Sequence, residues 1–182
     1  LLPPDEGMGI FNGVLEHLSG DIILGNLEGP ITTAPTSPKC REGSRNCYAF
    51  RTPPSMAPRL SEAGFNALNI ANNHAYDFGS RGMNETISIL ESLGIQPVGG
   101  KKVATFRVRD VRVAVAGFSY FNTPYSHSIC DVSSAAETVK ELKEKNDIVV
   151  VTFHGGAEGR NARHVADQEE LYLGENRGNV VG

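Results

Sequence analysis

The chain has 182 residues, a formal net charge of −4 and 40% hydrophobic residues. This length suits one domain with a sizeable core, and a modest negative charge without a basic block disfavours nucleic acid as a partner. No apolar run is long enough to span a bilayer, and the start, Leu1-Leu-Pro-Pro-Asp5, lacks the charged and apolar regions of a signal peptide. Because the chain begins without Met and stops at Val-Val-Gly, we expect both ends to be cut.

Hydrophobic periodicity predicts helices that alternate with strands. Apolar residues at helical spacing, glycine stops and short β-rich runs define the elements. In chain order they are a helix over residues 10–18, a strand over 21–26, a helix over 56–63, a strand over 68–71, a helix over 83–93, strands over 104–108 and 111–116, a helix over 134–142 and a strand over 148–151. The last helix opens with Ser134-Ala-Ala-Glu137, which has the pattern of a capping box.

Strands separated by helices of this length predict an α/β fold with helices on the outer faces. Arg109-Asp110 separates two β-rich runs and predicts a hairpin, so the sheet is expected to be mixed. We expect one domain over residues 1–182. The long irregular connections, residues 29–53 and 118–131, are expected near the strand ends that carry the chemistry.

The three cysteines bear on the compartment. Cys40 and Cys47 flank a short polar stretch, and the pattern fits a local disulfide, which implies an oxidising compartment, as well as two unrelated reduced thiols. Cys130 is interpreted as a small, half-buried side chain before a helix. Zinc held by cysteines is disfavoured, because no Cys-x-x-Cys spacing occurs.

Three segments share one design, an apolar run followed at once by metal-capable or proton-transferring side chains. They are residues 21–28 (DIILGNLE), 67–74 (ALNIANNH) and 147–154 (DIVVVTFH). Ligands of open α/β sheets gather beyond the carboxyl ends of the strands, where residues distant in sequence can converge. The pattern therefore predicts one site built from three strand ends.

The densest of these clusters contains Asn73 and His74. An amide oxygen beside an imidazole offers a neutral oxygen ligand and a proton donor or nitrogen ligand, and we favour this role over a simple turn. Asp77 can hydrogen-bond His74 or cap the helix that begins near Ser80, and we favour the cap.

Glu28 and His154 complete the predicted set. A lone glutamate after a strand is more often a loop residue, but a dication needs anionic oxygen and Glu28 is the carboxylate available at a strand end. His154 follows the most β-branched run, and a ligand role is favoured over a histidine that only closes the sheet. His17 and His127 are interpreted as surface residues, and His164 could face the pocket.

Four stretches carry more specific motifs. They are residues 21–32, with Asn-Leu-Glu-Gly-Pro, residues 64–79, with Ala-Asn-Asn-His-Ala-Tyr-Asp-Phe-Gly, the pair Leu93-Gly-Ile and Val98-Gly-Gly, and residues 147–159. Together they resemble the CapA capsule-synthesis proteins, a family associated with poly-γ-glutamate. The resemblance covers about residues 21–159.

The resemblance implies a fold similar to calcineurin-like metallophosphoesterases, a four-layer α/β/β/α sandwich, here truncated at both ends. It implies two divalent metal ions, of Mn, Zn, Fe or Mg, with Glu28, Asn73 and His154 as ligands and His74 as the catalytic acid. The flanking polar residues are expected to contact the substrate: Asn26, Asn72, Asp77 and Glu158.

The chain also departs from the family pattern. A Gly-Asp at the end of the first strand, a Gly-His-x-x-His-type loop and a Leu-Gly-Asn-Phe segment are all missing from this sequence. Gly155 stands where many members have an aromatic residue. The predicted coordination set is therefore incomplete in this chain.

Three functions remain open at this stage. The first is metal-dependent hydrolysis of a phosphoester or related bond, in which two ions activate water and clamp an oxyanion. The second is a non-catalytic component of a capsule export complex that binds polyglutamate in the same cleft, and the third is an interaction module only. The expected partners are an acidic polymer or phosphoester and a membrane-bound capsule synthesis complex, and the expected location is outside the cell or at its envelope.

Overall fold

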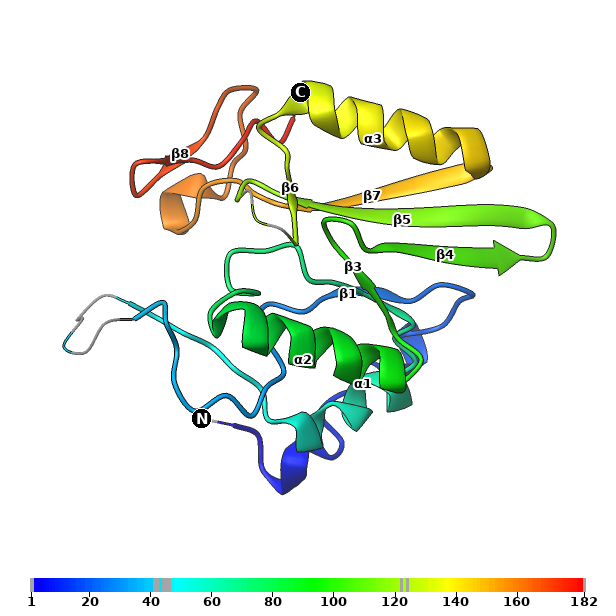
Figure 1. Ribbon diagram of the computed structural model, residues 1–182, viewed down its shortest axis with the longest axis vertical. Coiled ribbons are helices and arrows are strands. Elements are labelled where there is room, and N and C mark those ends of the chain that lie inside the picture. Colours follow the sequence, from blue (N-terminus) through cyan, green and yellow to red (C-terminus); the bar gives the residue numbers. More distant parts are fainter. Residues whose placement is uncertain (1, 41–42, 44–46, 122, 124, 182) are drawn as a thin grey trace. The chain divides into compact units, whose positions relative to one another are not determined.

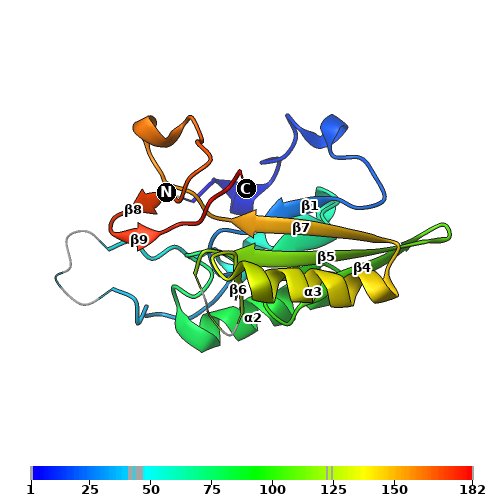
Figure 2. The ribbon, with the colours of Figure 1, turned by 90° about the horizontal axis from the view of Figure 1, so that it is seen from above.

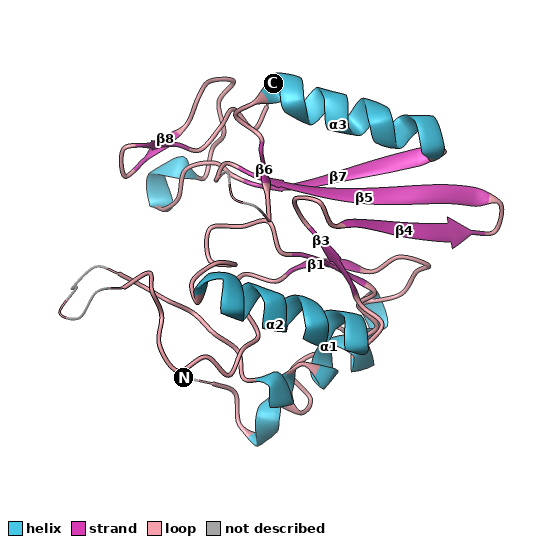
Figure 3. Cartoon of the chain, in the orientation of Figure 1, coloured by secondary structure: helices cyan, strands magenta, loops and turns pink. Residues whose placement is uncertain are grey.

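The computed structural model describes residues 2–40, 43, 47–121, 123 and 125–181. These residues form two compact units, shown as ribbons in Figures 1 and 2. Unit 1 contains residues 1–70 and 74–97, and unit 2 contains residues 71–73 and 98–182. Both units combine helices with strands (Figure 3), so the predicted α/β class with mixed sheets is confirmed.

Unit 1 is built on a three-stranded sheet in the order β1-β2-β3. Its elements are the 3-10 turns η1 (Asp5–Gly7), η2 (Leu15–His17) and η3 (Pro54–Met56), the strands β1 (Leu24–Asn26), β2 (Ala67–Asn69) and β3 (Gln96–Val98), and the helices α1 (Pro58–Glu62) and α2 (Gly79–Ser92). β1 and β2 are parallel, with Asn26 opposite Asn69. A side chain at Gly25 would lie 2.9 Å from both Leu68 and Phe65, so glycine permits this close approach.

Helix α2 shows how the sequence fixes unit 1. Its Met83 and Leu90 are almost completely buried, at 1% and 0% exposure, on one face of the helix. Gly94, at a φ of 74°, ends the helix as predicted, and Ile95 N–H donates to the Leu90 carbonyl at 2.9 Å. A core helix with a defined stop therefore lies directly before β3.

The predicted helix over residues 10–18 is wrong. Apart from 3-10 turns the segment is irregular. Gly7 and Gly9 adopt φ values of 75° and 76°, and Gly13 follows within the segment. Closely spaced glycines make helix nucleation more costly, so the apolar periodicity is not sufficient here.

Unit 2 carries a mixed sheet. Its elements are β4 (Val103–Val108), β5 (Val111–Ser119), β6 (His127–Ser128), β7 (Ile148–His154), β8 (Leu171–Tyr172), β9 (Glu175–Asn176), α3 (Val132–Lys145) and η4 (Arg160–Ala162). β4 and β5 form the predicted antiparallel hairpin, while β6 and β7 pair with β5 in parallel. Arg109, at a φ of 55°, makes the hairpin turn.

Helix α3 packs along β7 and β5, as Figures 1 and 2 both show. The helix begins at Val132, and the Asp131 carboxylate caps it by accepting from Ser134 N–H at 3.1 Å. The capping box at Ser134 is therefore wrong, because an aspartate upstream already satisfies the free amide. Cys130 is exposed rather than half-buried.

None of the helices in the described residues is long and apolar enough to cross a bilayer. The expectation of a single domain over residues 1–182 stays a prediction. The four-layer sandwich involves both units together and also stays a prediction.

Candidate functional site

The ends of β1 and β2 meet at one edge of the sheet in unit 1, because the two strands are parallel neighbours. Asn26, the last residue of β1, accepts a hydrogen bond from the Asn69 side-chain amide at 3.2 Å. Leu27 N–H donates to the Asn69 carbonyl at 2.9 Å, which extends the pairing by one residue beyond β1. Glu28 follows as an exposed side chain in the turn. Two of the three predicted strand ends therefore lie side by side.

His74 is held from behind by a buried carboxylate. Its Nδ1 lies 2.7 Å from Oδ2 of Asp77, whose side chain is only 1% exposed. Phe50 N–H donates to the same oxygen at 2.8 Å, and the Lys39 ammonium forms an ion pair with the other oxygen, Oδ1. The Phe50 ring lies against the imidazole, with the ring centroids 4.4 Å apart. The imidazole is thus fixed through one ring nitrogen and one ring face.

This arrangement corrects the interpretation of Asp77 as a helix cap. Helix α2 begins at Gly79, and no described side chain caps it. The Asp77 carboxylate instead contacts His74, Lys39 and Phe50. The hydrogen bond to His74, the alternative that the sequence also allows, is the one present. The expected contact of Asp77 with substrate stays a prediction.

The residues before His74 differ in how their polar groups are satisfied. Asn72 is 5% exposed. Asn73 is half-buried, and its Oδ1 atom is buried without a hydrogen-bond partner in the described part of the chain. An unpaired buried carbonyl oxygen is costly, and such exceptions in folded proteins call for a specific explanation, including an ion. Asn73 is the predicted metal ligand, and a hard cation is a suitable partner for this oxygen.

His154 is the last residue of β7, in unit 2. It lies opposite Ser119 of β5, and its carbonyl accepts from Tyr120 N–H at 3.0 Å. The Tyr120 and His154 rings are 6.5 Å apart between centroids. His154 is half-buried, so its imidazole is at the rim of this sheet, as the sequence predicts.

Glu158 lies in a cluster around a buried arginine. The Arg177 side chain is 6% exposed, donates to Glu158 at 3.2 Å and lies 3.5 Å from Glu175. Its guanidinium carbon is 4.0 Å from the Tyr120 ring centroid and 5.1 Å from that of Tyr172. Arg177 therefore ties the β8–β9 segment to the end of β5, beside His154.

The predicted ligands suit a divalent cation by their chemistry. Carboxylate and amide oxygens with an imidazole are the donors expected for Mn, Mg, Fe or Zn. Within the described residues, no three side chains of His, Cys, Asp or Glu gather into a metal-binding group. The fit therefore depends on Asn73, whose buried oxygen has no hydrogen-bond partner among the residues that the structure describes. A site that joins Glu28, Asn73 and His154 stays a prediction.

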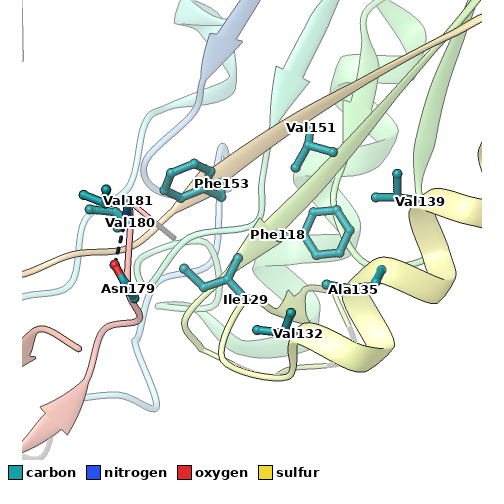
Figure 4. A pocket seen from close by; sticks show the side chains of 11 residues that line it. Phe118, Ile129, Val132, Ala135, Val139, Val151, Phe153, Asn179, Val180 and Val181 are labelled. Atoms are coloured by element: carbon teal, nitrogen blue, oxygen red, sulfur yellow. Dashed lines mark hydrogen bonds between the residues drawn. The ribbon is translucent and has the colours of Figure 1, made fainter. Parts of the chain in front are cut away.

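A separate hollow in unit 2 is apolar (Figure 4). Its walls come from α3, β7, the end of β5 and the last described residues, with Phe118, Ile129, Val132, Val151 and Phe153 among its lining. Asn179 is the polar residue among the described residues that line it, and no ionisable side chain does so. The hollow therefore does not contain the chemistry predicted at the strand ends.

Sequence reasoning missed Lys39, Phe50 and Arg177. Lys39 and Phe50 belong to the long insertion and approach Asp77 only in the folded chain. Their signal in the sequence is weak, because a lysine beside a cysteine and a phenylalanine in a polar loop suggest nothing specific. The pairing of Cys40 with Cys47 is now settled, since the two form a disulfide with Cα atoms 5.6 Å apart.

Fold and site together define an α/β protein with polar, metal-capable residues at the carboxyl ends of its parallel strands. The chain belongs to the family described as bacterial capsule synthesis protein PGA_cap, whose sequence model matches residues 6–172. The resemblance to CapA proteins is therefore confirmed.

The relatives include two CapA proteins. The chain is 28% identical over 160 residues to the PGA biosynthesis protein CapA of Bacillus subtilis, and 29% identical over 172 residues to the capsule biosynthesis protein CapA of Bacillus anthracis. These matches cover 79% and 84% of this chain but 41% of each relative. The chain thus spans about two fifths of the length of these relatives.

A solved chain from Staphylococcus aureus, assigned as a 5′-nucleotidase and in complex with α-ketoglutarate, is also similar. The similarity covers 66% of this chain and 26% of that one, at 20% identity and a TM-score of 0.44. Membership of the metallophosphoesterase superfamily stays a prediction.

Proposed function

We propose that the full-length protein acts in capsule or poly-γ-glutamate synthesis as a metal-dependent hydrolase of a phosphoester or related bond. The role in capsule synthesis is supported by family membership and by the CapA relatives. The hydrolytic role is supported by the residues at the strand ends. Its location is outside the cell or at its envelope, where the Cys40–Cys47 disulfide would persist.

One observation supports the metal site above all others: the buried Oδ1 of Asn73 has no hydrogen-bond partner within the described ranges of the chain. In the proposal Asn73 binds a divalent cation together with Glu28 and His154. Bound cations would supply Lewis-acid polarisation of the scissile group and orient it. Asn26, Asn72 and Glu158 lie within four residues of these ligands in the sequence and would contact the substrate.

His74 is the proposed acid. Because an ionised carboxylate only accepts hydrogen bonds, the Asp77 contact requires the proton on Nδ1 of His74. That contact orients the ring, so Nε2 is the nitrogen that can deliver a proton to a leaving oxygen. Asp77 therefore positions the acid, in the manner in which carboxylates commonly orient catalytic histidines.

The replacement His74→Asn in the full-length protein tests this role. Turnover of p-nitrophenyl phosphate mono- and diesters should fall by about 100-fold or more, as expected for loss of a general acid. The metal content, measured by elemental analysis, should change little, since His74 is not a proposed ligand. Unchanged turnover in this variant would remove His74 from the acid role.

The non-catalytic alternative predicts a different pattern. A full-length protein that binds poly-γ-glutamate and retains metal, yet hydrolyses none of the esters, would be a binding component of the capsule machinery. An intact protein without bound metal would instead support an interaction module.

A further inference from the structure

The insertion after β1 is a closed loop anchored on helix α2. Its two stems pair through the backbone, with Thr32 N–H donating to the Thr52 carbonyl at 3.1 Å and Thr52 N–H to the Pro30 carbonyl at 2.9 Å. Glu85 of α2 accepts from the Thr32 hydroxyl at 2.6 Å, and this hydrogen bond lowers the pKa of the Glu85 carboxyl. The Thr86 hydroxyl accepts from Ile31 N–H at 2.9 Å. The base of the loop is therefore held in place.

Both arms of this loop reach Asp77. On the first arm, the Ser37 hydroxyl donates to the Asp77 carbonyl, and the Lys39 ammonium pairs with its carboxylate. On the second arm, Phe50 N–H donates to the carboxylate at 2.8 Å, and the Phe50 ring contacts His74. The loop thus supplies two of the three groups that contact the Asp77 carboxylate, Lys39 and Phe50, and the third is His74 itself.

The disulfide joins the two arms just beyond these contacts. Cys40 directly follows Lys39, and Cys47 precedes Phe50 by three residues. A lysine side chain is long and loses rotamer freedom when it is held in one position. The disulfide already restricts the backbone beside Lys39, so less conformational entropy is lost when the ammonium is held at Asp77. The cross-link therefore favours the ordered position of the ammonium.

The donors around the carboxylate define what Lys39 does. The Lys39 ammonium can only donate hydrogen bonds, and Nδ1 of His74 already carries the proton that it donates to Asp77. Lys39 lies 3.2 Å from this nitrogen, but its hydrogen bond therefore goes to the Asp77 carboxylate. Lys39 supplies the positive charge that compensates a carboxylate only 1% exposed. Without it, the buried charge that orients His74 would lack its nearest cation.

We infer that Lys39 is a positioning residue for His74, and that the Cys40–Cys47 disulfide holds Lys39 at Asp77. The catalytic part of this inference rests on the proposed function, in which His74 is the acid. The orientation of His74 by Lys39 is a separate physical claim. It follows that an oxidising compartment favours the contact between Lys39 and Asp77 and that reduction of the disulfide loosens this contact.

The first test is nuclear magnetic resonance of the full-length protein labelled with ¹⁵N-histidine. A hydrogen-bonded Nδ1–H of His74 should give a proton resonance that is missing in His74→Gln, which provides the assignment. Lys39→Met, which keeps the aliphatic stem and removes the charge, should broaden or abolish this resonance. Lys39→Arg should retain it, as should Lys140→Met, a matched control at an exposed lysine of α3. An unchanged resonance in a folded Lys39→Met protein would overturn the inference.

The second test concerns the disulfide. Replacing both Cys40 and Cys47 by serine should weaken the same resonance, though less than Lys39→Met does, because the loop stems remain anchored on α2. Should Lys39→Met fail to fold, this double variant decides the question, and a resonance identical to that of the parent would contradict the role of the loop.

Activity separates this inference from the proposed function. With p-nitrophenyl phosphate esters as probes, Lys39→Met should lower kcat by about 10-fold with little change in KM, and Lys39→Arg should restore most of it. If the parent hydrolyses none of these esters but its His74 resonance responds to Lys39 as described, the proposed function fails and the orientation of His74 by Lys39 stands. If the esters are hydrolysed and kcat is the same in the parent and Lys39→Met, Lys39 has no positioning role.

Discussion

Strands β2 and β7 each lie next to a predicted site histidine, which follows β2 in a turn and ends β7, yet the surroundings of the two strands differ. All three residues of β2 are buried, whereas none of the seven residues of β7 reaches that level. The neighbouring helices differ in the same way, since α2 has five buried residues and α3 has none. Similar apolar runs therefore form strands in both units, but the run alone does not determine how deeply the strand is buried.

The difference extends to the two histidines. His74 is fixed by a buried carboxylate, an aromatic ring and a disulfide-closed loop. The His154 carbonyl accepts from Tyr120 N–H, and the two rings lie 6.5 Å apart between centroids. The turn after β2 thus orients its histidine, which suits the proposed acid, whereas the histidine proposed as a ligand ends β7 at a sheet rim.

The largest expected effect is a loss of stability, which we compare for one substitution in each strand. Leu68→Ala in β2, where Leu68 is 2% exposed, should lower the free energy of unfolding by about 2–5 kcal/mol. Val150→Ala in β7, where Val150 is 38% exposed, should cost less than about 1 kcal/mol. Urea unfolding of both variants checks this, and equal losses would show that the two strands are covered alike.

A smaller loss of stability is expected when a buried carboxylate is replaced by an amide, and a still smaller loss when an exposed carboxylate is replaced. Asp77→Asn places an amide among three donors and should cost about 1–3 kcal/mol, because one carboxylate oxygen is replaced by an NH₂ group. The matched control is Asp147→Asn, at an exposed carboxylate that pairs with Arg112 at 3.0 Å. Thermal unfolding at neutral pH should show the larger loss for Asp77→Asn, and the reverse order would contradict the burial argument.

The smallest expected effect is a pH dependence at the start of β7. Hydrogen bonds from the Arg112 side chain and backbone lower the pKa of Asp147 from 3.8 to about 2. Because the pKa is lower in the folded state, this stabilisation is present above pH 3.8 and is lost as the pH falls toward 2. The difference in Tm between the parent and Asp147→Asn should therefore shrink over this range, and a constant difference would contradict the assignment.

The sequence predicted the regular elements where local pattern and packing agree. Gly94 stops α2, the Arg109 turn joins β4 to β5, and β-branched residues form β7, because each of these features depends on neighbouring residues. The prediction failed for residues 10–18, where glycines outweigh the apolar spacing.

For the site, the sequence predicted the residue types at the strand ends but not what surrounds them. Asn73 and His74 were identified because they follow a buried strand. Lys39 and Phe50 could not be identified from the sequence, because their contacts with Asp77 depend on how a long insertion folds back. The sequence favours a cap at Asp77 because an aspartate just before a helix commonly caps it, whereas the contact with His74 depends on burial that only the fold creates.

The most direct measurement of the central claim is the metal content of the full-length protein and of three variants, Glu28→Gln, Asn73→Ala and His154→Ala, by elemental analysis after mild dialysis. The account predicts about two divalent ions per chain in the parent, as in two-metal hydrolytic sites, and a clear loss in each variant while His74→Asn retains its metal. A folded parent without bound ions, or the same content in all three variants, would contradict it.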